Sequence, residues 1–137
     1  MATYKTNYIG GLRAESTHLQ SGIIILTDAP TDNMGKGEAF SPTDLVATAL
    51  GTCIITTMSI FGQKEGIDFT GSALTGTKIM TQEGPRKIAR IEIEIELKTN
   101  IELEQPQKEK YERIAATCPV AQSLSPELEQ VVKISWV

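Results

Sequence analysis

The two cysteines, Cys53 and Cys118, are the residues best suited to redox chemistry in this 137-residue chain. They lie 65 residues apart, so the chain lacks the CxxC spacing of a dithiol redox motif or a zinc ligand pair. Spacing alone leaves two explanations open. Either the thiols are unrelated buried side chains, or the fold brings them together.

Cys53 lies within an apolar run, where a cysteine usually packs as a small hydrophobic residue. Gly51 is a further signal beside Cys53, because a glycine inside a helix lowers the stability of the helix by about 1 kcal/mol relative to alanine. It indicates that another element approaches the helix closely at this point. These residues alone do not separate a structural Cys53 from a reactive one.

Cys118 stands directly before Pro119, and proline is typical of the first turn of a helix. The partial positive charge and free N–H groups of a helix start stabilise a thiolate. Cys118 is therefore well placed for a reactive thiol, and a buried capping residue is the alternative.

Other residues of the kinds that bind metals or ligands give weaker signals. His18 is the only histidine, and together with two distant cysteines it makes a poor metal site. The glutamates at 92, 94 and 96 alternate with apolar residues, which predicts a solvated sheet face. We expect no metal and no cofactor, and we expect Tyr111 and Trp136 in the core.

A long helix must position Cys53. Ser41 is a good N-cap, Pro42 suits the first helical position, and Asp44 completes a capping pair three residues on. Residues 45–61 then carry no charge. A helix that is apolar on nearly every face is covered on more than one side, and in so short a chain we attribute part of the cover to a second subunit.

Strands and shorter helices complete an α+β pattern, which we expect to form one domain over residues 1–137. The fifth strand has the clearest alternation, with apolar residues at every second position from 91 to 97. Helical segments are predicted to begin at Pro106 and Pro119. The strands are predicted at residues 2–9, 12–19, 22–27, 71–81, 88–98 and 131–137.

Composition excludes several partner classes. The net charge of −4, without a cluster of Lys and Arg, argues against nucleic-acid binding. No run reaches the roughly 18 apolar residues that span a bilayer, and the start lacks the apolar stretch of a signal peptide. We therefore expect no nucleic acid, no membrane and a cytoplasmic location, where thiols stay reduced.

Three segments resemble the OsmC/Ohr family. Residues 40–53 (FSPTDLVATALGTC) are similar to its central-helix motif, which carries the reactive cysteine, and residues 115–122 (AATCPVAQ) to its second motif, a Cys-Pro pair. Residues 8–13 (YIGGLR) resemble its amino-terminal strands, which supply an arginine. The three occur in the family's order. The resemblance implies antiparallel sheets packed around a long central apolar helix, in an intertwined homodimer.

The resemblance also implies a peroxiredoxin-like thiol peroxidase that acts in oxidative stress defence. Cys53 would attack hydrogen peroxide or an organic hydroperoxide and become a sulfenic acid, and Cys118 would resolve it to a disulfide. Arg13 would stabilise the thiolate, since a guanidinium stays charged when partly buried. An external dithiol would then reduce the disulfide.

One position departs from the family pattern. A glutamate usually follows the helix-starting proline and holds the arginine, whereas this chain has Thr43 there. Asp44 and Glu38 are the candidates to replace that carboxylate, and the sequence does not choose between them. A capping role for Asp44 fits equally well.

Two other functions fit the same sequence. One is a non-enzymatic protein of this fold that binds a small apolar ligand at a dimer interface. The other is a disulfide-exchange or redox-sensing protein in which Cys53 and Cys118 cycle without peroxide. The reactivity of the Cys53 thiol separates the first from an enzyme, and its preference for peroxide over a disulfide separates the second.

Overall fold

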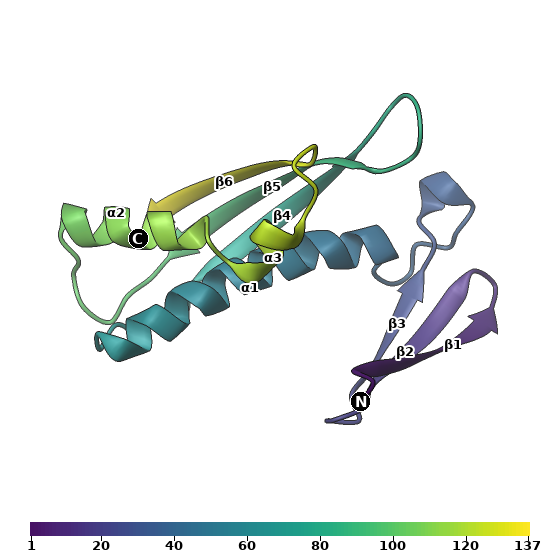
Figure 1. Cartoon of the computed structure of the whole chain (residues 1–137), viewed down its shortest axis with the longest axis horizontal. Coiled ribbons are helices and arrows are strands. Elements are labelled where there is room, and N and C mark those ends of the chain that lie inside the picture. The colour runs from purple at the N-terminus through teal and green to yellow at the C-terminus, as the bar shows by residue number, and fades with distance from the viewer. The chain divides into compact units, whose positions relative to one another are not determined.

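The computed structural model describes all 137 residues, which form two compact units, residues 1–46 and 47–137 (Figure 1). The first unit contains three strands and the start of the long helix α1 (Pro42–Lys64). The second contains the rest of α1, three more strands and two shorter helices. The single domain over residues 1–137 stays a prediction.

The first unit is an antiparallel sheet with strand order β1-β2-β3. Its strands are β1 (Tyr4–Gly10), β2 (Arg13–His18) and β3 (Ile24–Asp28), and a 3-10 turn follows at Thr31–Asn33. Gly10 and Gly11 join β1 to β2 with φ values of 87° and 64°, which glycine adopts without steric cost. The predicted hairpin and third strand are therefore confirmed.

This first sheet buries almost none of its apolar side chains. Asp28 and Ser41 are the only buried residues among the first 46, and both are polar. The exposed apolar side chains on its strands are Tyr4, Tyr8, Ile9, Ile24, Ile25 and Leu26. A sheet of this size needs a packed apolar face to be stable. The first unit therefore presents apolar surface that its own residues leave uncovered.

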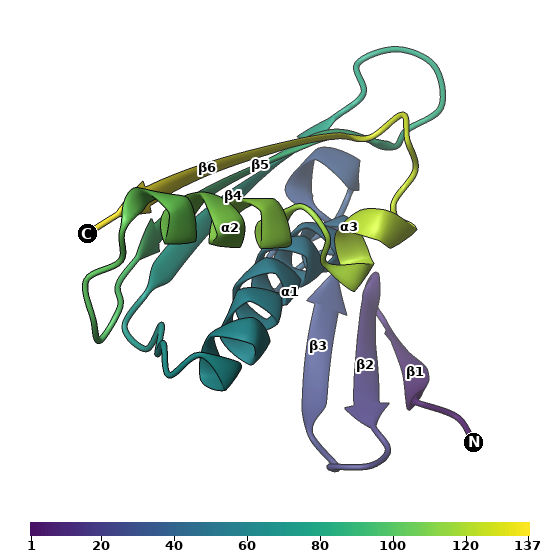
Figure 2. The ribbon, with the colours of Figure 1, turned by 60° about the vertical axis from the view of Figure 1, so that its left-hand side comes forward.

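The second unit has a sheet with α1 and α2 (Gln105–Ala115) on the same face (Figure 2). Strands β4 (Ala73–Met80) and β5 (Ile88–Leu97) are antiparallel, and β6 (Glu129–Trp136) lies parallel to β5 on its other side. The predicted alternation is confirmed, because Ile91, Ile93, Ile95 and Leu97 are all buried. The parallel pair departs from the antiparallel sheets we expected. The chain returns to β6 through α2 and α3 (Pro119–Ser123), a crossover that parallel pairing requires.

Gly51 allows α1 to lie close to the second sheet. A Cβ atom at this position would lie 2.8 Å from Leu74 Cδ1 and 3.5 Å from Ile93 Cδ1. The close approach predicted from the glycine is therefore confirmed. The buried residues of α1 are Ala47, Leu50, Gly51, Ile54, Met58 and Gly62.

The length and composition of α1 alone would allow it to cross a membrane, since an 18-residue window has a mean hydropathy of 1.8. The expectation that no run would be apolar enough was wrong. The helix nevertheless buries one face on the second sheet, as Gly51 shows, and is the core helix of a soluble protein.

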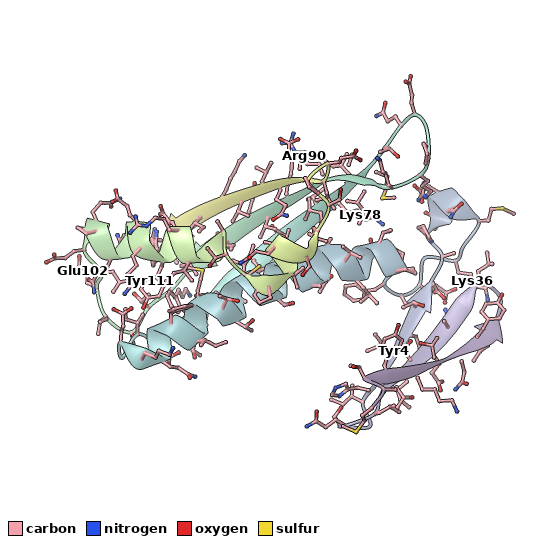
Figure 3. The ribbon with its side chains drawn as sticks, viewed as in Figure 1. Tyr4, Lys36, Lys78, Arg90, Glu102 and Tyr111 are labelled. Atoms are coloured by element: carbon pink, nitrogen blue, oxygen red, sulfur yellow. The ribbon has the colours of Figure 1, made fainter.

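The two aromatic residues expected in the core differ in burial. Tyr111, labelled in Figure 3, lies on α2 and is fully buried. Its ring is edge-on to Phe69, with the ring centroids 5.3 Å apart, and its hydroxyl donates to Glu65 Oε1 at 2.7 Å. Trp136 is half-buried, and its Nε1 donates to Glu112 at 3.0 Å. Tyr111 thus joins α2 to the end of α1 and lies in the core, whereas Trp136 lies at the edge of the core.

Candidate active site

Cys53 lies in the middle of α1, within the second unit, and its side chain is half-buried. Its sulfur lies 3.8 Å from the Thr57 hydroxyl oxygen, one helical turn further along. A mid-helix position gives the thiol no help from the partial charges at helix ends, whose effect is confined to the first and last turns. Any stabilisation of a Cys53 thiolate must therefore come from neighbouring side chains.

Cys118 is completely buried and is the N-cap residue of α3. Its sulfur accepts a hydrogen bond from the Ala121 backbone N–H at 3.3 Å. This confirms that a new helix begins at Pro119, with Cys118 before it in an extended conformation. The capping role predicted as the alternative for Cys118 is therefore present, and a hydrogen bond to the sulfur does not exclude a reactive role.

Cys53 and Cys118 lie close enough in the second unit to influence each other. Burial raises the pKa of the Cys118 thiol, the Ala121 N–H opposes that rise, and a hydrogen bond and charge interaction with Cys53 raise the pKa further. Two cysteines 65 residues apart in sequence thus lie close enough for one to raise the pKa of the other, and both are free thiols. The fold therefore supports the explanation in which it brings the two thiols together, and not the one in which they are unrelated buried side chains.

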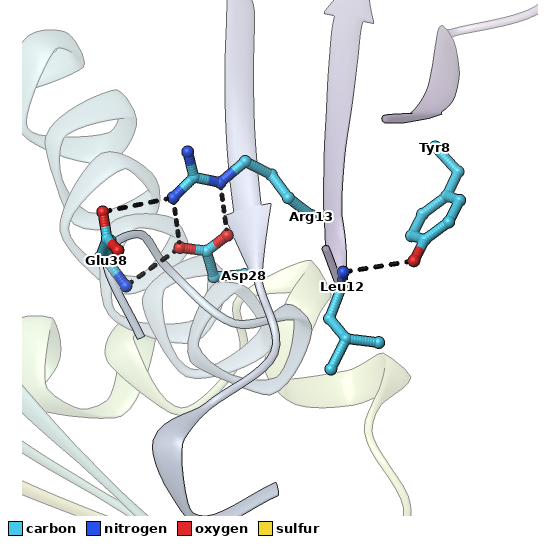
Figure 4. Close-up of polar contacts among 5 residues, drawn as sticks. All are labelled: Tyr8, Leu12, Arg13, Asp28 and Glu38. Atoms are coloured by element: carbon cyan, nitrogen blue, oxygen red, sulfur yellow. Dashed lines mark hydrogen bonds and ion pairs between the residues drawn. The ribbon is translucent and has the colours of Figure 1, made fainter. Parts of the chain in front are cut away.

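Arg13 belongs to the first unit, where β2 carries it directly opposite Asp28 of β3. Its Nε donates to Asp28 Oδ1 at 2.6 Å and its Nη2 to Asp28 Oδ2 at 2.9 Å, a two-pronged contact (Figure 4). Glu38 Oε2 lies 3.6 Å from the same Nη2. None of these contacts uses Nη1.

The electrostatics of this cluster favour the charged forms of Arg13 and Asp28. The hydrogen bond from Arg13 holds the pKa of Asp28 below its ordinary value against the effect of burial, and the Glu38 backbone N–H assists at 3.0 Å. The same contact with Asp28 raises the pKa of Arg13 above its already high value. Arg13 is therefore a fixed cation whose orientation is set by a buried carboxylate.

The two carboxylates proposed from sequence have different roles. Glu38 does contact Arg13, although its side chain is exposed. Asp44 caps α1, since its Oδ2 accepts the Ser41 N–H at 2.9 Å and its own N–H donates to Ser41 Oγ at 3.0 Å. The capping box predicted at the helix start is confirmed.

Sequence reasoning missed Asp28, the main partner of Arg13. A signal existed: in an antiparallel pair joined by a short turn, the residue at the start of one strand faces the end of the next. Arg13 opens β2 and Asp28 closes β3. The sequence predicts both strands, and the register between them sets Asp28 opposite Arg13.

The remaining candidates form no metal site. His18 is exposed, and its Nδ1 lies 2.6 Å from the Ser21 hydroxyl. No group of three or more His, Cys, Asp or Glu side chains is placed to hold a metal ion. On the outer face of the second sheet, Glu94 and Glu96 are exposed and Glu92 bonds Arg90 at 2.7 Å. The glutamate stripe is thus largely solvated, as expected.

Residues 35–133 match the family model described as OsmC-like protein. The chain is similar to an osmotic stress induced and detoxification response protein of Psychrobacter arcticus 273-4, with 44% identity, a TM-score of 0.91, and coverage of 98% of this chain and 96% of that one.

Two hydroperoxide resistance proteins share the fold at lower identity. OsmC of Legionella pneumophila has a TM-score of 0.71 at 15% identity, covering 98% of each chain. OhrB of Bacillus subtilis has a TM-score of 0.63 at 15% identity, again covering 98% of each chain. A search of curated proteins gave no match.

Proposed function

The chain belongs to the OsmC-like family, and from that premise we propose that it is a thiol peroxidase that reduces organic hydroperoxides or hydrogen peroxide. The observation that carries the proposal is that the fold places Cys53 of α1 and Cys118 at the start of α3 in the same unit, close enough for Cys53 to raise the pKa of the Cys118 thiol. Cys53 is half-buried and so reachable by a substrate, which suits the peroxide-attacking thiol, whereas Cys118 is buried, which suits the resolving partner.

The proposed reaction has three steps. The Cys53 thiolate attacks the outer oxygen of the hydroperoxide, an S–O bond forms, the O–O bond breaks, and the alkoxide leaves and takes up a proton as an alcohol. The Cys118 sulfur then attacks the Cys53 sulfenic acid, which forms a disulfide and releases water. An external dithiol reduces the disulfide by exchange and is itself oxidised to a disulfide.

Arg13 is the proposed cation of the site. Asp28 orients its guanidinium through Nε and Nη2, so Nη1 is available to donate to a thiolate or a peroxide oxygen. Glu38 adds a weaker contact from an exposed side chain. The family's glutamate, which holds the arginine, is absent here because Thr43 stands in its place. We propose that Asp28, with help from Glu38, holds Arg13 instead.

A homodimer is part of the proposal, because the first unit leaves an apolar surface uncovered. Its sheet and the first turn of α1 border a groove of about 580 Å³ whose apolar lining includes Ala14, Ile23, Ile25, Pro42 and Leu45. A second copy of the chain would cover this groove and bury the exposed apolar side chains of β3. Arg13 would then serve Cys53 of its own chain or of the partner.

The proposed setting is the cytoplasm, where cellular reductants return both cysteines to thiols. The external reductant is a dithiol, because the second of its two thiols releases the mixed disulfide formed by the first. Hydroperoxides and this dithiol are the only small molecules that the proposed cycle requires.

Peroxide consumption in the presence of a dithiol tests the proposal. We expect Cys53→Ser to abolish turnover, and Cys118→Ser to stop after one sulfenic acid per chain, measured by mass spectrometry after trapping with dimedone. If both variants consume peroxide as fast as the wild type, the thiol mechanism is wrong. Faster oxidation by a model disulfide than by cumene hydroperoxide would instead identify a disulfide-exchange protein.

A further inference from the structure

The hydroxyl side chains of α1 fall into two groups. Most bond to the helix backbone, which is the usual habit of serine and threonine inside a helix. Thr52 Oγ1 donates to the Thr48 carbonyl at 2.9 Å, Thr56 Oγ1 to the Thr52 carbonyl at 2.9 Å, and Ser59 Oγ to the Ile55 carbonyl at 2.8 Å. Thr57 is different, because its hydroxyl contacts the Cys53 sulfur.

The geometry of this contact follows from the helix. Residues four apart lie one above the other on the same face, so Thr57 is placed directly beside Cys53. Both side chains are half-buried, and the oxygen–sulfur distance is 3.8 Å. A hydroxyl can donate or accept a hydrogen bond. The Thr57 hydroxyl can therefore accept a hydrogen bond from the S–H group of a thiol and donate one to a thiolate.

Cys53 needs such a donor. Its neighbours on α1 are apolar or uncharged, and Cys118, the titratable group that interacts with it, is a buried thiol. The cation proposed for the site, Arg13, already has Asp28 on two of its nitrogens and Glu38 nearby. Two carboxylates therefore partly neutralise the positive charge that is proposed to stabilise the thiolate.

We propose that Thr57 is a hydrogen-bond donor to the Cys53 thiolate, which it holds ready to attack a hydroperoxide. This inference rests on the proposed peroxidase function and adds a residue to its site. The bond strengthens when Cys53 becomes charged, since hydrogen bonds to an ionised partner are the stronger ones. In the disulfide the sulfur carries no charge, and the hydroxyl is free to turn to the Cys53 carbonyl, as Thr56 does towards Thr52.

Three variants separate this role from a structural one. Thr57→Val removes the hydroxyl and keeps the shape, while Thr57→Ser keeps the hydroxyl. Thr56→Val is the matched control, because Thr56 is exposed on the same helix and its hydroxyl bonds only to backbone carbonyls. None of the three changes adds or removes a charge on α1, so a general electrostatic effect is avoided.

The first measurement is the rate at which iodoacetamide alkylates Cys53 between pH 5 and 10, read from the Cys53 peptide by mass spectrometry. We expect Thr57→Val to move the midpoint of this profile upward by about half to one pH unit, a three- to tenfold smaller thiolate fraction below the midpoint. Thr57→Ser and Thr56→Val should keep the wild-type midpoint. An unchanged midpoint in Thr57→Val, or a Thr57→Ser midpoint shifted equally, would refute the proposal.

The second measurement is the rate constant for Cys53 oxidation by cumene hydroperoxide at pH 7, which we expect to fall about three- to tenfold in Thr57→Val alone. A wild-type protein that does not react with any peroxide would remove the proposed function, yet the alkylation profile would still report on Thr57. If the wild type is a peroxidase but Thr57→Val changes neither the oxidation rate nor the alkylation profile, the proposed function stands and the proposed role of Thr57 is refuted.

Discussion

The two units of the chain bury opposite kinds of side chain. In residues 1–46 the only buried side chains are Asp28 and Ser41, and each is held by hydrogen bonds. In residues 47–137 the buried set is almost entirely apolar and includes the inward side of β5 and the full side chain of Tyr111. The second unit therefore has a core of its own, whereas the first has an ordered polar cluster beside an apolar surface.

This contrast bears on how the proposed site is divided. The sulfur atoms belong to the unit with the packed core, where rigid surroundings keep the two thiols adjacent. The arginine belongs to the other unit, where Asp28 orients it and where, by our proposal, a second subunit covers the apolar surface. Reactivity would then depend on both units, because the second holds the two thiols and the first fixes the orientation of the arginine.

The largest effect is expected from placing a charge in the apolar groove of the first unit. Ile25→Asp puts a carboxylate where the proposed partner packs, and an unpaired buried charge is strongly unfavourable. We expect a dimer at micromolar concentration to become a monomer in size-exclusion chromatography with light scattering. Ile79→Asp, an exposed apolar position on β4, is the control and should remain a dimer. A monomeric wild type would contradict the proposal that a second subunit covers the first unit.

A smaller effect should follow from loosening the polar cluster. Asp28→Asn keeps the volume but removes the charge and one of the two oxygens that hold Arg13. We expect the peroxidase rate to fall about tenfold to a hundredfold, with the unfolding of the second unit unchanged. Glu38→Gln should cost less than threefold, because Glu38 is exposed and its contact is 3.6 Å long. Equal losses in both variants would show that Asp28 has no special part in orienting Arg13.

The core of the second unit can be tested at Gly51. In Gly51→Val the new side chain meets Leu74 and Ile93, and overpacking of this kind costs about 1–3 kcal/mol. We expect urea unfolding to show a loss of about that size. Thr52→Val, on the exposed side of the same turn, should stay within about 0.5 kcal/mol of the wild type. A neutral Gly51→Val would mean that the sheet can move away from α1.

The smallest effect concerns Tyr111. Burial, and secondly Glu65, raise its pKa to about 12 in the folded state. The folded state thus holds this proton more tightly than the unfolded state. The stabilisation is complete below the ordinary tyrosine pKa of about 10, declines between pH 10 and 12, and is lost above that.

Tyr111→Phe checks this dependence. At pH 8 it should cost about 1 kcal/mol through the lost bond to Glu65. The difference in unfolding free energy between wild type and variant should then shrink by about 1 kcal/mol from pH 9 to 11. Tyr4→Phe, which changes an exposed tyrosine, should show no such trend. A constant difference would mean that Tyr111 ionises no later than a free tyrosine.

The sequence by itself determined the local elements of this protein. The start of α1 at Ser41 and Pro42, the helix after Cys118, the alternation along β5 and the close approach at Gly51 were all predicted and confirmed. Each depends on capping, fixed φ angles or periodicity, which act over a few residues. Motif order was enough to place the chain in its family.

The tertiary structure decided which distant residues meet. The register of β2 and β3 sets Asp28 opposite Arg13, and the crossover through α2 and α3 makes β6 parallel to β5 and brings Cys118 to Cys53. The apolar surface of the first sheet also became visible only in the folded chain. The physical reason is that strand register and packing are settled by the sum of many contacts between segments far apart in sequence, which no local pattern records.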